Sequence, residues 1–142
     1  MTPLFFFGTL MDADVLGLVI GRAVAPGELE PARLHGFRRV RARRASYPVL
    51  VPDPGASVEG VLWRAGTALE RARLDAYEGP AYALAPVEVE TAAGERVRAL
   101  VYCAVPGALE PSEEPWDLAR WQARYKAAYL RLGERLREAD PP

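Results

Sequence analysis

The chain has 142 residues, of which 18 are Lys or Arg and 19 are Asp or Glu, giving a formal net charge of -1. This length fits one domain with a substantial core, so we predict a single domain over residues 1–142. Balanced charge gives no reason to expect nucleic acid or an anionic membrane surface as a partner. No stretch is apolar for long enough to span a membrane, and residues 4–7 lack the basic start of a signal peptide. We therefore expect a cytoplasmic protein.

The first predicted elements are a buried strand and a short helix. Residues 4–7 are apolar and too few for a helix, which indicates a strand. Residues 11–20 are predicted to form a helix, with Asp12 as its N-cap and Gly21 as its stop. Residues 28–44 contain at least one further strand, because apolar residues and arginines alternate along the end of this segment.

Two hairpins are predicted in the middle of the chain. Residues 47–51 and 58–63 have strand character and are separated by Pro52-Asp53-Pro54-Gly55, so we expect them to pair across a turn. The second hairpin pairs residues 87–90 with residues 97–105 across an Ala-Gly turn. Hairpins mixed with helices argue for an α+β fold, with a strongly bent sheet or small barrel and flanking helices.

The helices of the second half are marked by a capping box and by an aromatic stripe. Thr67-Ala68-Leu69-Glu70 opens a helix that ends at a Gly-Pro stop. Residues 106–115 form a loop rich in Pro and acidic residues. From about residue 116 we predict a long amphipathic C-terminal helix, whose stripe we interpret as core packing. Its members are Trp116, Trp121, Tyr125, Tyr129, Leu132 and Leu136.

Glu78 is the strongest candidate for a chemical role. It ends the predicted helix just before Gly79 and Pro80. The carboxylate is disfavoured there, since a helix C-terminus carries partial negative charge. Partial burial would raise its pKa further, as a general base and acid near neutral pH requires. The alternative is a solvent-exposed Glu that happens to end a helix.

A second candidate site is the junction Phe7-Gly8-Thr9-Leu10, where the first strand runs towards a helix. Such a junction is able to point backbone N–H groups at an anion, with Gly8 permitting close approach and Thr9 adding a hydroxyl. By itself this pattern more often marks a purely structural junction between a strand and a helix. No Gly-rich loop has dinucleotide or P-loop spacing.

These two segments resemble the motifs of the gamma-glutamylcyclotransferase-like family. Phe7-Gly8-Thr9-Leu10 resembles its Tyr-Gly-Ser/Thr-Leu loop, and residues 77–82 resemble its Glu-Gly-x-x-Tyr motif. Residues 47–63 are similar to the hairpin between them. The resemblance spans roughly residues 4–105 and implies a compact, mostly antiparallel barrel with flanking helices.

The resemblance also implies a reaction. The α-amine of a small-molecule gamma-glutamyl substrate attacks its own side-chain carbonyl, releasing 5-oxoproline and an amine or amino acid. Glu78 would move the protons, while Phe7, Gly8, Thr9 and Leu10 would bind the glutamyl carboxylate. No metal or organic cofactor is implied. Tyr82 either contacts Glu78 or substrate, or simply packs its ring.

One residue departs from the family pattern: Phe7 stands where the family usually has Tyr, so a hydroxyl is missing. The alternative function is therefore a non-catalytic protein of the same fold that binds a small carboxylated ligand or a partner. A third is a nucleic-acid binder using the basic run of residues 38–44, which we instead interpret as a solvated strand face paired with acidic segments. His35 and Cys103 are interpreted as structural residues. Tyr47 has the same two alternatives as Tyr82, a contact with Glu78 or substrate or simple packing of its ring, and packing is favoured.

Overall fold

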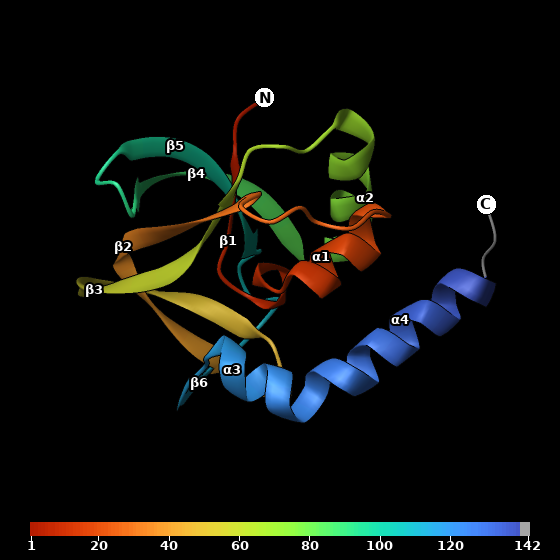
Figure 1. The fold of residues 1–142 in the computed structure, drawn as a ribbon. Coiled ribbons are helices and arrows are strands. Elements are labelled where there is room, and N and C mark those ends of the chain that lie inside the picture. The colour runs from red at the N-terminus through yellow and green to blue at the C-terminus, as the bar shows by residue number, and fades with distance from the viewer. Residues whose placement is uncertain (140–142) are drawn as a thin grey trace.

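The computed structural model describes residues 1–139, with residues 134–139 described as helical backbone only (Figure 1). The strands are β1 (Leu4–Phe6), β2 (Leu29–Ala42), β3 (Pro48–Trp63), β4 (Tyr82–Thr91), β5 (Arg96–Ala104) and β6 (Pro111–Pro115). The helices are α1 (Ala13–Ile20), α2 (Ala68–Glu78), α3 (Leu118–Trp121) and α4 (Ala127–Ala139). A 3-10 turn, η1 (Thr9–Met11), precedes α1, and a π-helical segment, η2 (Gln122–Lys126), joins α3 to α4.

The sheet closes on itself. Its strand order is β3-β1-β5-β4-β2-β6, and an additional pairing between β3 and β2 closes the first five strands into a barrel. β1 and β5 pair in parallel, whereas the other recorded pairs are antiparallel. α1 and α2 lie together beside the barrel (Figure 1). The predicted α+β class, with a small, mostly antiparallel barrel and flanking helices, is confirmed. No helix within residues 1–139 has the length and apolar character needed to cross a membrane.

The predicted hairpin between residues 47–51 and 58–63 is wrong, because both segments belong to the single strand β3. This strand pairs with β2 in two stretches, from Leu29 opposite Trp63 to His35 opposite Ser57, and from Phe37 opposite Pro52 to Arg41 opposite Pro48. The register shifts between His35 and Phe37, opposite the Pro-rich segment of β3. Prolines remove backbone donors, so they interrupt the ladder locally. The pairing on both sides of the interruption keeps the chain extended, and the turn signal marks an irregularity instead of a reversal.

The predicted loop over residues 106–115 is partly wrong, since its second half forms the edge strand β6. Val40 lies opposite Pro115 and Ala42 opposite Pro111. Proline is tolerated in a strand at a sheet edge, where its missing N–H is not needed by a neighbour. Two ion pairs add to the pairing: Arg41 to Glu114 at 2.8 Å and Arg43 to Glu110 at 3.6 Å. The predicted hairpin of residues 87–90 and 97–105 is confirmed as β4 and β5.

The predicted caps of α1 are confirmed, although the helix begins at Ala13 and Met11 belongs to η1. The Asp12 carboxylate accepts from the amides of Asp14 (2.9 Å) and Val15 (3.2 Å). Gly21 ends the helix with a φ of 86°, a left-handed conformation that glycine adopts without strain.

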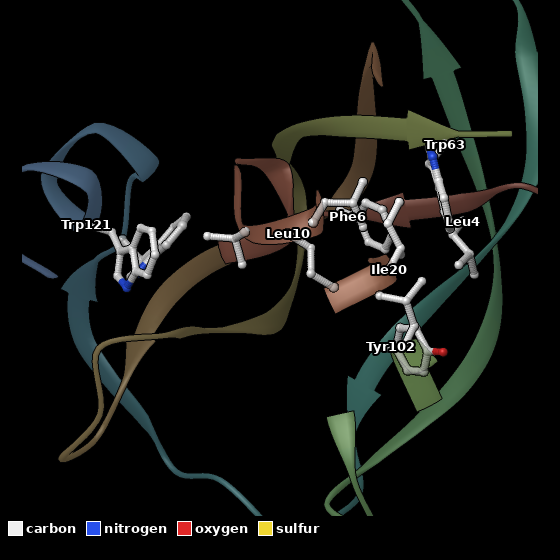
Figure 2. Close-up of a cluster of buried hydrophobic side chains, with 11 residues drawn as sticks. Leu4, Phe6, Leu10, Ile20, Trp63, Tyr102 and Trp121 are labelled. Atoms are coloured by element: carbon white, nitrogen blue, oxygen red, sulfur yellow. The ribbon is translucent and has the colours of Figure 1, made fainter. Parts of the chain in front are cut away.

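The largest core cluster lies between the barrel and the helices (Figure 2). β1 contributes Leu4 and Phe6, α1 contributes Ile20, and β3 contributes Trp63, all of them at most 3% exposed. The Phe6 and Trp63 rings pack with centroids 5.8 Å apart. Burying such large side chains is the main stabilising term in a fold of this size.

The C-terminal aromatic stripe is only partly a core element. Trp116 and Trp121 are buried, and Tyr129 packs edge-on against Trp121 with centroids 5.4 Å apart. Tyr125 and Leu132, however, are 41% and 57% exposed, so the prediction is wrong for these two. The π-helical segment changes the angle per residue, and α4 then runs away from the barrel (Figure 1). The last predicted member, Leu136, lies outside the residues whose side chains are described.

Candidate functional site

A cavity of about 380 Å³ opens where the end of β1 meets the end of α2. Its lining includes every residue that the sequence indicated for the site: Phe7, Gly8, Thr9, Leu10, Glu78 and Tyr82. The remaining lining residues are mostly aromatic or small, and they are Phe5, Phe6, Ser46, Tyr47, Pro48, Tyr77, Ala81, Tyr102, Trp121 and Tyr129. The barrel thus brings the two sequence motifs, about seventy residues apart, to one apolar hollow.

Glu78 is the last residue of α2, and both ends of that helix are fixed by local sequence. At the start, Thr67 and Glu70 form the predicted capping box, and Arg22 holds the Glu70 carboxylate at 2.6 Å. At the end, Gly79 has a φ of 74°, which stops the helix. The helix therefore delivers Glu78 to the cavity at a set position.

The electrostatics around Glu78 favour its neutral form. Burial raises the pKa of Glu78 from 4.5 to about 7. No Arg, Lys or His appears among the described residues that line the cavity, so no cation there stabilises the carboxylate. A carboxyl group with a pKa near neutrality is able both to accept and to donate a proton under physiological conditions.

The loop opposite Glu78 presents backbone donors. The amides of Gly8, Thr9 and Leu10 find no acceptor among the described residues. The turn itself is closed by the Met11 amide bonding Gly8 O and the Asp12 amide bonding Thr9 O, each at 3.0 Å. Unpaired amides beside a cavity are available to an anionic ligand.

Two groups hold this loop in place. Arg39, within the basic run, donates through Nη1 to Phe7 O (2.8 Å) and Glu59 O (2.9 Å) and through Nε to Trp116 O (3.1 Å). Burial lowers the pKa of the Arg39 guanidinium. The prediction of a solvated strand face is therefore wrong for Arg39, which ties three separate segments together. Its neighbour Arg41 pairs with acidic β6, as that interpretation expects.

The second support is Asp12, which directly follows η1 and is 3% exposed. Besides capping α1, its Oδ2 accepts from Gln122 Nε2 at 2.7 Å and faces Lys126 Nζ at 2.8 Å. Burial alone would raise the pKa of Asp12, but the bonds from Lys126 and Gln122 outweigh it and lower the pKa. The π-helical segment thus supports the loop through the contacts of Gln122 and Lys126 with Asp12.

Two tyrosines, Tyr82 and Tyr102, lie near Glu78. Burial first, and then the nearby Glu78 and Tyr47, raise the pKa of Tyr82 to about 12. Tyr102 of β5 donates its hydroxyl to Asp75 of α2, and burial with this bond raises its pKa. The sequence reasoning missed Tyr102. Strand alternation is the signal that would have found it, since Val101 packs in a different core cluster from Tyr102.

His35 and Cys103 lie away from the cavity. The His35 ring is 60% exposed and its Nε2 lies 3.5 Å from Glu90 on the barrel surface. Cys103 is half-buried in β5, and burial raises the pKa of its thiol. Neither side chain lines the site.

Comparison with known proteins agrees with this architecture. Residues 4–123 match the family model described as gamma-glutamyl cyclotransferase, AIG2-like. AIG2-like protein A from Arabidopsis thaliana is 27% identical over 135 residues, which cover 94% of this chain and 80% of that protein. Two solved structures share the fold. A solution structure of an Arabidopsis thaliana protein has a TM-score of 0.67 at 24% identity, covering 99% of this chain and 93% of that chain. A structure described as gamma-glutamyl cyclotransferase has a TM-score of 0.63 at 18% identity, covering 94% of this chain and 86% of that chain. The chain belongs to the gamma-glutamyl cyclotransferase, AIG2-like family.

Proposed function

We propose that this protein is a gamma-glutamyl cyclotransferase, which converts a gamma-glutamyl compound to 5-oxoproline and a free amine or amino acid. The observation that carries the proposal is Glu78, whose pKa of about 7 is set by burial in a cavity that also exposes the unpaired amides of residues 8–10. Membership of the family supports the same reaction class.

In the proposed reaction, ionised Glu78 takes a proton from the substrate's α-ammonium group. The freed amine nitrogen attacks the side-chain carbonyl carbon, and a carbon–nitrogen bond closes the five-membered ring. Glu78 then delivers this proton to the departing nitrogen as the original amide bond breaks. It takes the second proton from the ring nitrogen, which leaves a neutral lactam N–H, and passes that proton to the released amine. The amine therefore departs as an ammonium ion, and Glu78 ends ionised as it began. A positioned acid–base group contributes a factor of about 10²–10⁴ in rate.

The loop supplies the second part of the mechanism. The amides of Gly8, Thr9 and Leu10 bind the glutamyl carboxylate and hold the chain folded, with the amine near the carbonyl that it attacks. Both reacting groups belong to one molecule. Fixing its geometry therefore removes much of the entropic contribution to the activation free energy. Arg39 and Asp12 act as supports, since they bond the segments flanking these amides.

The missing hydroxyl of Phe7 is compensated in this proposal by tyrosines on other elements. Tyr82 and Tyr102 both line the cavity, and Glu78 contributes to the raised pKa of each phenol. Both therefore remain protonated donors at neutral pH. In the proposed reaction Tyr82 orients the Glu78 carboxyl group or the substrate.

The experiment that tests the proposal is an assay for 5-oxoproline release over a panel of gamma-glutamyl amino acids, amines and isopeptides. Glu78→Gln removes proton transfer but keeps size, so we expect a loss of at least about 10²-fold in kcat. Glu113→Gln, which makes the same change at an exposed position on β6, is the matched control and should leave the rate unchanged. Retained turnover in Glu78→Gln would refute the mechanism.

A binding measurement tests the loop separately. Crystals of the protein soaked with 5-oxoproline should show its carboxylate against the amides of residues 8–10. A carboxylate bound elsewhere, with this loop empty, would refute the assigned binding mode.

The second candidate is a protein of this fold that binds a small carboxylated ligand without turning it over. Phe7 favours this candidate, because it removes a hydroxyl that the family usually places in the pocket. Binding of 5-oxoproline in solution without turnover of any substrate in the panel would select it.

A further inference from the structure

A second hollow, of about 250 Å³, adjoins the cavity of Glu78. Ser46 and Trp121 line both spaces, so the two hollows share a wall. The second hollow is bounded by the end of β2, by β6 and by the helical segments α3 and η2. Figure 1 shows these elements gathered at one end of the barrel, where α3 lies beside β6.

The charges that line the second hollow are not balanced. Three of its side chains are arginines and two are carboxylates. Glu114 forms an ion pair with Arg41 at 2.8 Å. Asp117 caps α3 by accepting from the Arg120 amide, also at 2.8 Å. Arg41 is the first cause of the lowered pKa of Glu114, and Arg120 lies close enough to that carboxyl to help lower it. Neither Arg120 nor Arg124 has a carboxylate of the described residues within 4.0 Å, so two carboxylates face three guanidinium groups.

An aromatic ring lies beside one of these guanidinium groups. Arg124 Cζ lies 5.8 Å from the ring centroid of Tyr125, which also lines the hollow. A guanidinium resting on a ring has a restricted range of positions and keeps its N–H groups available at the edge. Arginine in this arrangement suits a planar carboxylate, which it is able to bind through two parallel hydrogen bonds.

The described lining of the first cavity contains no cationic side chain that could bind a second carboxylate. Glu78 is the one charged side chain in its described lining, and its negative form would repel another anion. In the proposed binding mode the glutamyl carboxylate occupies the amides of residues 8–10, so a carboxylate on the departing half of the substrate would pair best with a cation outside this cavity. The path leads along the β2–β3 turn, since both Glu78 and Tyr47 lie close to Tyr82 and Tyr47 is the neighbour of Ser46.

We infer that the second hollow is the leaving-group subsite, in which Arg120 and Arg124 bind a carboxylate carried by the amine that departs. This inference rests on the proposed function. It makes the two arginines specificity-determining residues, which favour gamma-glutamyl conjugates of amino acids over conjugates of neutral amines. Both arginines are exposed, so replacing them leaves the core and the Glu78 cavity intact.

The test compares substrates that share the glutamyl half and differ only in a leaving-group carboxylate. Gamma-glutamyl-glycine, gamma-glutamyl-β-alanine and gamma-glutamyl-γ-aminobutyrate place the carboxylate at increasing reach, and gamma-glutamyl-propylamine is the neutral counterpart of the longest. For the best-fitting carboxylate we expect kcat/KM to exceed that of the neutral substrate by about tenfold or more, as a charge-assisted hydrogen bond provides. The preference should weaken with added salt.

The double variant Arg120→Gln/Arg124→Gln should reduce this ratio to near one while leaving kcat/KM for the neutral substrate unchanged. Arg131→Gln removes one positive charge, half the change in the double variant, from an exposed position on α4 outside the hollow and should keep the wild-type ratio. An equal loss in Arg131→Gln would overturn the inference by assigning the preference to net charge. A wild-type ratio near one, or a ratio unaffected by the double variant, would overturn it while leaving the cyclotransferase intact. No turnover of any of the substrates would instead refute the proposed function and, with it, the subsite.

Discussion

Glu78→Gln should stabilise the protein at neutral and alkaline pH and should do so less in acid. The pKa of Glu78 is about 7 in the fold, against an ordinary value of 4.5. Below pH 4.5 the carboxyl group is protonated in both the folded and the unfolded chain. Between 4.5 and about 7 the unfolded chain has lost this proton and the folded chain still holds it, so the free energy of unfolding falls as pH rises. Above that window the penalty is constant.

The size of the effect follows from the width of the window. A difference of about 2.5 pKa units, from 4.5 to about 7, corresponds to an upper limit of ~3 kcal/mol. Glu78 is only partly buried, and solvent screening reduces this value, so we expect roughly 1–2 kcal/mol. Gln also removes a negative charge from the C-terminus of α2, which adds a few tenths of a kcal/mol in the same direction.

Thermal unfolding of wild type, Glu78→Gln and the control Glu113→Gln measures this effect. At about pH 8, Glu78→Gln should unfold several degrees higher than wild type, as ~1–2 kcal/mol implies for a domain of this size. Near pH 4.5 the two melting temperatures should converge, because wild-type Glu78 is then protonated in the fold. A difference that is the same at both pH values, or equal in Glu113→Gln, would refute the burial argument for Glu78.

Further predictions concern the site and its supports. The rate of 5-oxoproline release should fall as pH is lowered through about 7, because the base form of Glu78 is lost, and a rate profile flat from about pH 5 to 8 would contradict this. Lys126→Met should lower the free energy of unfolding by about 1–3 kcal/mol in a denaturant titration, since it leaves the buried Asp12 carboxylate without its cation, whereas Lys126→Arg should retain most of the stability. Gly60→Ala should destabilise the barrel by about 1–3 kcal/mol in the same titration, because the added Cβ would clash with the carbonyl oxygen of Phe6; a wild-type midpoint would show that β1 and β3 separate easily.

Local sequence was sufficient for the elements whose limits are set by short-range hydrogen bonds. The capping box of Thr67 and Glu70 and the left-handed stop at Gly79 place Glu78 at the end of α2 without reference to the rest of the chain. The side chain of Asp12 fixes the start of α1 in the same way. These features were predicted because all their partners lie within four residues.

Only the tertiary structure decided the features that depend on distant partners. Residues 47–63 carry a turn signal, yet pairing with β2 on both sides keeps them in one strand. Arg39 belongs by pattern to a solvated face, but the carbonyls of Phe7 and Trp116 that it binds arrive from other parts of the chain. Tyr125 and Leu132 fit a helical stripe, but the π-helical segment turns them outwards.

The site divides along the same line. The sequence by itself singled out Glu78 and residues 7–10 as the candidate site, from local position and motif, and the fold brings them to one cavity. It did not determine the environment, because a pKa near 7 requires burial, and burial is supplied by side chains from β5, the β2–β3 turn and the C-terminal helical segment. A sequence motif identifies the chemical groups of the site. Their desolvation, which sets the pKa, depends on all the side chains that pack around them.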